Sequence, residues 1–249
     1  PGLTASPSRL FLGGGAGTAE VTISASVPWT ATVEDSWVIL NPSSGMAGTT
    51  TLTLSLTENS TGGTRTTQII LSSPGFENML LPVSQYAMVD VMPGTLRDQL
   101  AQSGMLELMT HLAVKGTIDA RDFKTMRDEM PLLISVDLRG ATIAAYTGTE
   151  GTATYTIPPP VISYEANTIP QYGFSNRLNL TTLLFPPSLT AFGEYCFYNT
   201  GFTHMDIPPS VTSLGRGTFA NSQYLESVTI PESIARLEND AFAGCSALS

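Results

Sequence analysis

The sequence predicts a multidomain protein, with an N-terminal all-β immunoglobulin-like sandwich and a C-terminal repeat solenoid of short strands that begins with a helical cap. Three observations predict this class. Apolar and polar side chains alternate up to residue 85, residues 88–130 change to helical spacing, and the remainder repeats every 22 or 23 residues. A chain of 249 residues has room for two such domains.

The composition excludes several classes of protein. Charged residues make up 13% of the chain, about half the usual ~25%, and the formal net charge is −10. Because phosphate contacts need clustered lysine and arginine, we expect no nucleic-acid partner. No apolar run is long enough to predict a membrane-spanning segment. Abundant threonine and serine favour an exported protein, and the opening at Pro1 leads us to expect a signal segment or lipid anchor upstream.

Residues 9–85 predict about seven short strands of a sandwich without a disulfide. The apolar runs are 10–12, 21–25, 29–33, 37–40, 52–56, 69–71 and 81–83, and glycine, asparagine and serine separate them. Trp29 is in phase with Ala31 and Val33, so we expect it in the core. We expect the same of Trp37, and the alternative is that these indoles stack on sugar rings.

The order of several features in this segment resembles the BACON domain. The features are Trp29 after Pro28, Trp37, the sequence NPSSG at 41–45, Arg65 ahead of the apolar run 69–71, and the closing VSQ at 83–85. The resemblance implies a sandwich fold, a surface or periplasmic location and a role in carbohydrate binding.

Residues 87–132 predict a helical cap with two short helices. The clearer helix begins at Asp119, whose carboxylate accepts hydrogen bonds from the first free N–H groups, and runs to about Glu129. Ile118 and Phe123 have the spacing of a hydrophobic staple. We therefore divide the chain into a sandwich at 1–86, a cap at 87–132 and repeats at 133–249.

Phenylalanines reveal the repeat. Phe174, Phe197, Phe219 and Phe242 are separated by 23, 22 and 23 residues. Other apolar positions of the repeat recur with the same spacing. Among them are Phe185, Ile207 and Ile230, each of which is followed by proline. Residues 157–158 resemble an earlier copy, and residues 133–138 resemble a first, irregular one.

A turn of about 23 residues cannot bury its own apolar edge, so consecutive turns must stack. We expect residues 183–185, 205–207 and 228–230 to supply the strands, and the last three phenylalanines to stack as a buried ladder. Cys196 and Cys245 lie two turns apart, or about 10 Å at the usual strand spacing. That distance is too long for a disulfide, so we expect two free, buried cysteines.

The repeat also resembles a known family. The sequences LESVTIPESI at 225–234 and DAFAGCSAL at 240–248 are similar to the BspA-like leucine-rich repeat, from about residue 155 to the end. Residues 116–138 are similar to the helical cap and irregular first turn that precede such repeats. The resemblance implies a leucine-rich-repeat solenoid on the cell surface and adhesion to host matrix proteins or other cells.

Catalytic chemistry has little support in the sequence. His111 and His204 are isolated, and no nucleophile motif or metal-ligand cluster accompanies them. The glycines at 13–17 lack the lysine and the helix start of a phosphate loop, so we interpret them as a turn between strands. We therefore expect no enzyme activity and assign no catalytic, cofactor-binding or metal-binding residue.

Binding remains as the function. Tyr172, Tyr195, Tyr198 and Tyr224 occupy columns outside the core, and exposed aromatic residues are enriched in binding hot spots. These four are the candidate ligand-binding residues. We expect a monomeric surface or secreted protein whose repeats bind an extracellular protein. The alternatives are carbohydrate binding through the sandwich and a scaffold that binds no ligand.

Overall fold

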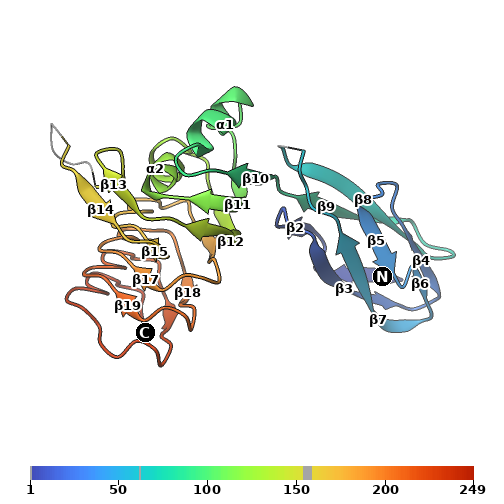
Figure 1. The fold of residues 1–249 in the computed structure, drawn as a ribbon. Coiled ribbons are helices and arrows are strands. Elements are labelled where there is room, and N and C mark those ends of the chain that lie inside the picture. The colour runs from blue at the N-terminus through green and yellow to red at the C-terminus, as the bar shows by residue number, and fades with distance from the viewer. Residues whose placement is uncertain (1, 62, 154–158) are drawn as a thin grey trace. The chain divides into compact units, whose positions relative to one another are not determined.

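The computed structural model describes residues 2–61, 63–153 and 159–249. The chain divides into two compact units, Pro1–Met88 and Val89–Ser249. Both are built mainly from β-strands, and the helices of the described residues, α1 (Leu96–Gln102) and α2 (Ala120–Asp128), belong to the second unit (Figure 1). The expected repeat copy at 157–158 lies outside the described residues.

The first unit is all β, as predicted, and its strands form two sheets. One sheet has the order β1 (Leu3–Ser6), β3 (Gly17–Ala25), β7 (Gly48–Leu56), β5 (Val38–Asn41). The other has the order β2 (Leu10–Leu12), β9 (Met79–Gln85), β8 (Arg65–Ser72), β4 (Trp29–Thr32), β6 (Ser44–Gly45). The strand β1 precedes the predicted range, and β6 lies where the sequence indicates only a loop.

Alternation along the strands builds the core of this unit. Val21, Ile23, Leu52 and Leu54 of one sheet are fully buried, and so are the inward residues of the other sheet. Trp29 is 2% exposed, which confirms its place in the core. Trp37 is half-buried against the same core, and the Arg65 guanidinium carbon lies 4.4 Å from its ring centroid.

Two buried amides fix the loops at one end of the sandwich. The Asn59 Nδ2 donates to the carbonyls of Gln85 and Tyr86, both at 2.9 Å. The Gln85 Nε2 donates to the carbonyl of Gly15 at 3.1 Å, and its Oε1 accepts from Arg65 at 2.7 Å. These bonds satisfy backbone groups that would otherwise be buried without partners.

The second unit begins with a sheet of order β10 (Met88–Val91), β11 (His111–Ile118), β12 (Ser135–Ile143), β16 (Thr182–Leu184), in which β11, β12 and β16 are parallel. Helix α2 follows the prediction closely. Its N-cap is Asp119, its C-cap is Glu129, and Ile118 and Phe123 are fully buried.

The cap predicted at 87–132 contains its two helices, but the strands β10 and β11, which the sequence did not predict, also lie there. Helix α1 ends at Gln102, where Gly104 takes a φ of +68°. The Met105 N–H then donates to the carbonyl of Leu100 at 2.9 Å, the hydrogen bond of a Schellman motif. Leu106 and Met109, which continue the apolar spacing predicted to be helical over 88–130, therefore lie outside α1.

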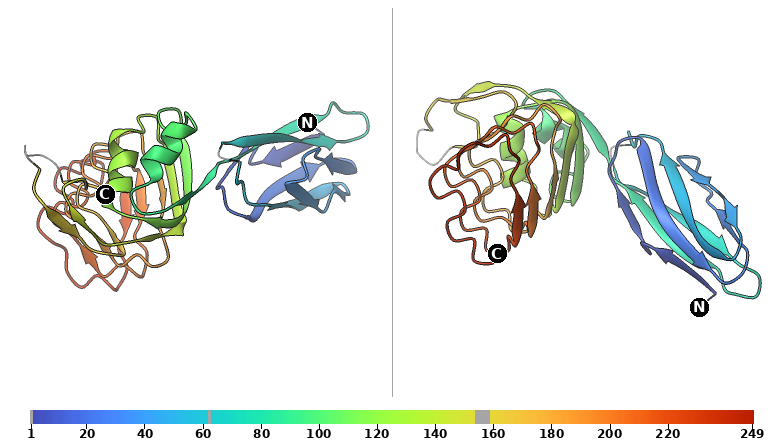
Figure 2. Two further views of the ribbon diagram at one scale, coloured as in Figure 1. Left: turned by 45° about the horizontal axis from the view of Figure 1, so that its top comes forward. Right: turned by 90° about the horizontal axis from the view of Figure 1, so that it is seen from below.

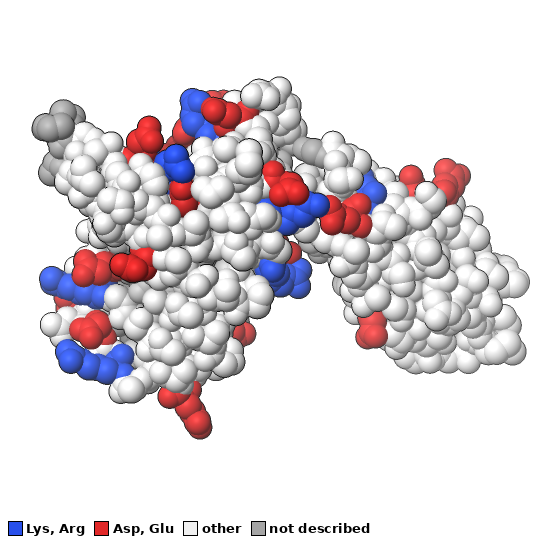
Figure 3. Space-filling model, in the orientation of Figure 1, with Lys and Arg blue, Asp and Glu red and all other residues white. Residues whose placement is uncertain are grey.

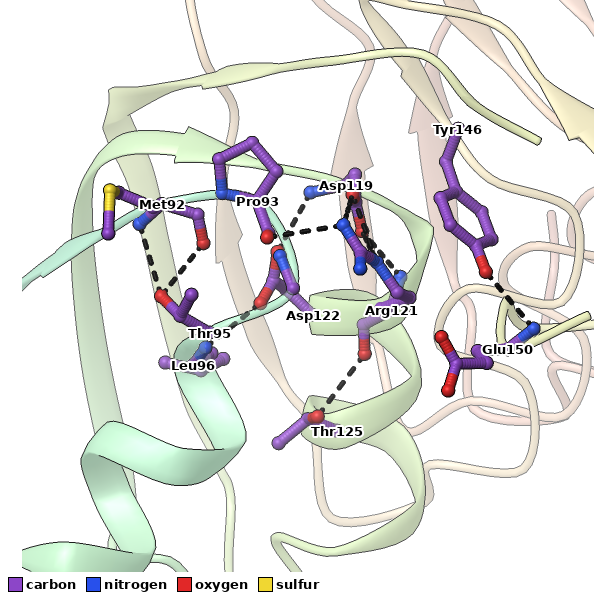
Figure 4. A network of polar contacts seen from close by, with 11 residues as sticks. Met92, Pro93, Thr95, Leu96, Asp119, Arg121, Asp122, Thr125, Tyr146 and Glu150 are labelled. Atoms are coloured by element: carbon purple, nitrogen blue, oxygen red, sulfur yellow. Dashed lines mark hydrogen bonds and ion pairs between the residues drawn. The ribbon is translucent and has the colours of Figure 1, made fainter. Parts of the chain in front are cut away.

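One carboxylate joins the two helices. Asp122, 1% exposed, accepts from the backbone N–H groups of Gly94 at 2.7 Å, Leu96 at 3.0 Å and Asp119 at 2.9 Å (Figure 4). Burial raises the pKa of Asp122, and the three backbone hydrogen bonds oppose that rise. The start of α1 is thus tied to the start of α2.

The later turns stack in register. Strands β15 (Thr168–Ile169), β17 (Ala191–Phe192) and β19 (Ser213–Leu214) form one parallel sheet, and β18 (His204–Asp206) pairs in parallel with β20 (Ser227–Thr229). Figures 1 and 2 show these turns one upon another from yellow to red. Before them, β13 (Tyr146–Gly148) and β14 (Ile162–Tyr164) form an antiparallel ribbon.

The predicted stacking of the phenylalanines is confirmed, but Phe242, expected to be buried, is only partly buried. Ring centroids are 6.2 Å apart for Phe174 and Phe197, and 5.4 Å apart for Phe197 and Phe219 and for Phe219 and Phe242. The first three rings are fully buried.

Two expectations for the last turn are wrong. Both cysteines are free, but only Cys196 is buried and Cys245 is partly exposed. Ile230, which shares the repeat position of Phe185 and Ile207 and was therefore expected in the core, is 42% exposed.

Candidate binding site

Each later turn contains a five-residue segment bounded by two residues in the left-handed region. Tyr172 (φ +56°) and Tyr195 (φ +52°) begin two of these segments, and Asn176 (φ +60°) and Asn199 (φ +53°) end them. Asparagine adopts this conformation readily, whereas it costs a bulky L-residue about 1–2 kcal/mol. A phenylalanine at the centre of each segment, fully buried in the first three, fixes its orientation.

This geometry gathers three tyrosines on one face. The rings of Tyr172 and Tyr195 stack with centroids 5.5 Å apart and an interplanar angle of 7°. The ring of Tyr198 stands edge-on to that of Tyr195, 6.1 Å away at 74°. Together with Ser175 and Asn176 they line a cleft of about 250 Å³, which we call the tyrosine cleft.

Glycine makes room for the stack. A Cβ built on Gly217 would lie 2.2 Å from Cε1 of Tyr195. The Tyr195 ring therefore packs against Gly217 of the following turn. Gly217 is the residue equivalent to Tyr195 in that turn. Gly217 also has a positive φ of +59°. Both the limited space and the backbone conformation therefore favour glycine at this position.

Amide hydrogen bonds connect the turns beside the cleft. The Asn199 Nδ2 donates to Oδ1 of Asn176 at 3.0 Å, and the Asn221 Nδ2 donates to the hydroxyl of Tyr198 at 2.8 Å. These bonds hold the rim of the cleft and the Tyr198 ring before any ligand arrives.

An ion pair joins the two turns that follow the one containing Tyr195 and Tyr198. Arg216 lies 3.1 Å from Asp240, and the hydrogen bond to that carboxylate, followed by the charges of neighbouring groups that include Tyr195, raises the pKa of the guanidinium. On the face of this unit drawn in Figure 3, acidic and basic side chains are interleaved. The residues that line the cleft are aromatic or polar and uncharged: Tyr172, Ser175, Asn176, Tyr195 and Tyr198.

The structure brings together three of the four predicted tyrosines. Tyr224 is 58% exposed, but it does not line the cleft. Sequence reasoning missed Ser175 and Asn176, although Asn176, Asn199 and Asn221 recur at spacings of 23 and 22 residues. That column was the signal that would have found the amide side of the cleft.

The two histidines lie on different strands, His111 on β11 and His204 on β18. Across residues 2–61, 63–153 and 159–249, no three His, Cys, Asp or Glu side chains are grouped closely enough to hold a metal ion. None of the helices in these ranges is long and apolar enough to cross a membrane.

Comparison with solved structures gives distant matches. A GH5 xyloglucanase from Bacteroides ovatus, solved with a XXXG heptasaccharide, is 16% identical with a TM-score of 0.33, covering 44% of this chain and 26% of its own. The CsuC–CsuE chaperone and tip-adhesion subunit complex of Acinetobacter baumannii is 16% identical with a TM-score of 0.30, covering 34% and 56%. The match thus spans about a quarter of the length of the xyloglucanase and about half of the length of the pilus protein. The search of curated proteins found no match.

Family models match both units. The BACON model, an N-terminal domain of inferred binding function, matches residues 27–85. The model of the BspA-type leucine-rich repeat region matches residues 154–249 in six copies. Domains of both kinds are typical of extracellular proteins and are associated with surface binding. The chain therefore carries a BACON domain followed by a region of BspA-type leucine-rich repeats.

Proposed function

We propose that this is a non-enzymatic surface or secreted adhesion protein, whose stacked turns form a leucine-rich-repeat solenoid that binds an extracellular protein through the tyrosine cleft. The observation that carries the proposal is the cleft of about 250 Å³ between Tyr172, Tyr195 and Tyr198.

The chemistry of the cleft supports a protein partner. Tyrosine offers a large, rigid contact area at low conformational cost, and serine and asparagine add adaptable hydrogen bonds. Antibody paratopes use the same residue types for the same reasons. The stack of Tyr172 on Tyr195 and the bond from Asn221 to Tyr198 hold the aromatic rings in place, which lowers the entropy lost on binding.

The test is binding of the full chain to immobilised fibronectin, fibrinogen and mucin, before and after Tyr195→Ala. We expect at least a tenfold loss of affinity for one of these proteins, since aromatic hot spots cost 2 kcal/mol or more when truncated. Tyr224→Ala is the matched control, because Tyr224 is exposed outside the cleft, and it should change affinity less than twofold. Equal losses in both variants, or no binding to any of the three proteins, would refute the proposal.

A second candidate function rests on the sandwich. Pro28, Trp29, Thr30, Ser72, Ser73 and Pro74 line a cavity of about 390 Å³. The buried Nε1 of Trp29 has no hydrogen-bond partner within the described residues. That N–H lies against Gly45, which does not line the cavity, so it is the cavity itself that favours glycan capture as the alternative activity.

A glycan array distinguishes this alternative. Signal from the full chain that is lost in Thr30→Arg, which places a long side chain at the cavity, would support glycan capture by the sandwich. Signal that persists in this variant would place the glycan elsewhere. A chain that binds neither glycans nor proteins would be a scaffold.

A further inference from the structure

The strand ladder of the second unit is interrupted between β16 and β18. Strand β16 pairs with β12, and β18 pairs with β20, but no backbone hydrogen bond joins β16 to β18 in the described part of the chain. The same two turns are bonded elsewhere, since β15, β17 and β19 are continuous. The interruption is therefore confined to this face.

Ring and side-chain contacts agree with an opening here. Phe174 and Phe197, which precede β16 and β18, have centroids 6.2 Å apart, against 5.4 Å for the next two pairs. Across the closed pair, the Thr229 hydroxyl donates to Asp206 at 2.7 Å. Leu184 occupies the corresponding position on β16, so Asp206 has no such partner on that side.

A cavity of about 320 Å³ lies along this opening, which we call the strand gap. Its lining is Arg139, residues 181–185, Phe202, residues 204–206 and Pro208. Leu183, Phe202 and Met205 are buried at its apolar floor, whereas Leu184 and His204 are exposed.

Backbone groups face the gap from both strands. Consecutive residues of a strand direct their N–H and C=O groups to opposite neighbours. The carbonyl of Thr203 accepts from Glu226, and the Ile207 N–H donates to Thr229, so His204 and Asp206 direct their backbone groups away from β20. By the same alternation, Thr182 bonds to Ile134 and Leu183 faces the gap.

We propose that the strand gap binds an extended segment of a partner protein, which adds backbone hydrogen bonds to one or both edges and directs one apolar side chain onto the floor. Unpaired strand edges are templates for another strand, and the main chain supplies affinity in such complexes while a pocket supplies specificity. The site is distinct from the tyrosine cleft and does not depend on it.

The test uses the full chain and a phage library of random linear heptapeptides. Selected peptides are synthesised and added to ¹⁵N-labelled protein. We expect slower amide hydrogen exchange at Leu183, His204 and Asp206. N-methylation of alternate peptide N–H groups should weaken binding at least tenfold, a readout that needs no variant of the protein.

Two variants complete the test. Leu184→Arg, at an exposed residue of the gap, should weaken binding at least tenfold, whereas Ser227→Arg, on an exposed residue outside the gap, should not. Tyr195→Ala should also leave peptide binding unchanged, which separates this site from the tyrosine cleft. Failure to select any peptide, or protection that lies away from the two strands, would overturn the proposal.

Discussion

The residues that shape the tyrosine cleft combine backbone strain with side-chain packing. Tyr172 and Tyr195 hold a left-handed backbone that costs a bulky residue about 1–2 kcal/mol. Their rings stack on each other, and the Tyr195 ring also packs against Gly217, which stabilises this conformation. Strained residues often cluster at functional sites, where the surrounding structure determines their conformation. The strain here lies at the residues proposed to bind.

The phenylalanine ladder sets the stability of the turns. Phe219 is fully buried between Phe197 and Phe242, so Phe219→Ala should lower the free energy of unfolding by about 3–5 kcal/mol, the range for a large cavity. Urea unfolding measures this loss. Phe242→Ala is the matched control, because Phe242 is only partly buried, and it should cost clearly less. Equal losses would contradict the ladder as the core.

The raised pKa of Tyr86 predicts a late step in an alkaline titration of the protein. Burial raises its pKa from 10.0 to about 12, because the neutral phenol is favoured inside the sandwich. The stability that this group contributes is therefore present below pH 10 and is lost as the pH rises through about 12. Absorbance of tyrosinate should show a final step near pH 12 that disappears in Tyr86→Phe; a step that survives in that variant would contradict the assignment.

At the scale of elements, the junction of α1 and α2 depends on Asp122. Asp122→Asn would place an amide NH₂ against one of three backbone N–H groups, so we expect a loss of about 1–3 kcal/mol in the free energy of unfolding. Asp98→Asn, at a side chain that is 74% exposed, is the control and should change stability little. No difference between the two variants in thermal unfolding would contradict the role of Asp122.

Local signals predicted some elements and missed others. Asp119 with Ile118 and Phe123 marked the start of α2, because capping and staple residues act within one turn. The strand β11 was missed because its buried centre, Leu112 to Val114, is a continuous apolar run, which periodicity does not distinguish from a helix. The end of α1 depended on Gly104, a single glycine that the helical spacing of the leucines concealed.

At the scale of the whole molecule, the sequence predicted the order of the two units, because the 23-residue spacing and the period-two alternation both extend over many residues. The site was predicted less fully. Tyr172, Tyr195 and Tyr198 were identified because they occupy repeat positions outside the core. The same reasoning selected Tyr224, which lies outside the tyrosine cleft. The strand gap left no sequence signal, since it is a missing set of backbone bonds and not a residue pattern.

The central claim is that the repeats bind a protein through the tyrosine cleft. The most direct measurement places a photoreactive benzoylphenylalanine at position 198 or, as control, at position 224, in complex with whichever of fibronectin, fibrinogen and mucin the chain binds. We predict a strong crosslink from position 198 and little from position 224. A crosslink from position 224 alone, or none from position 198 while the complex persists, would contradict the account.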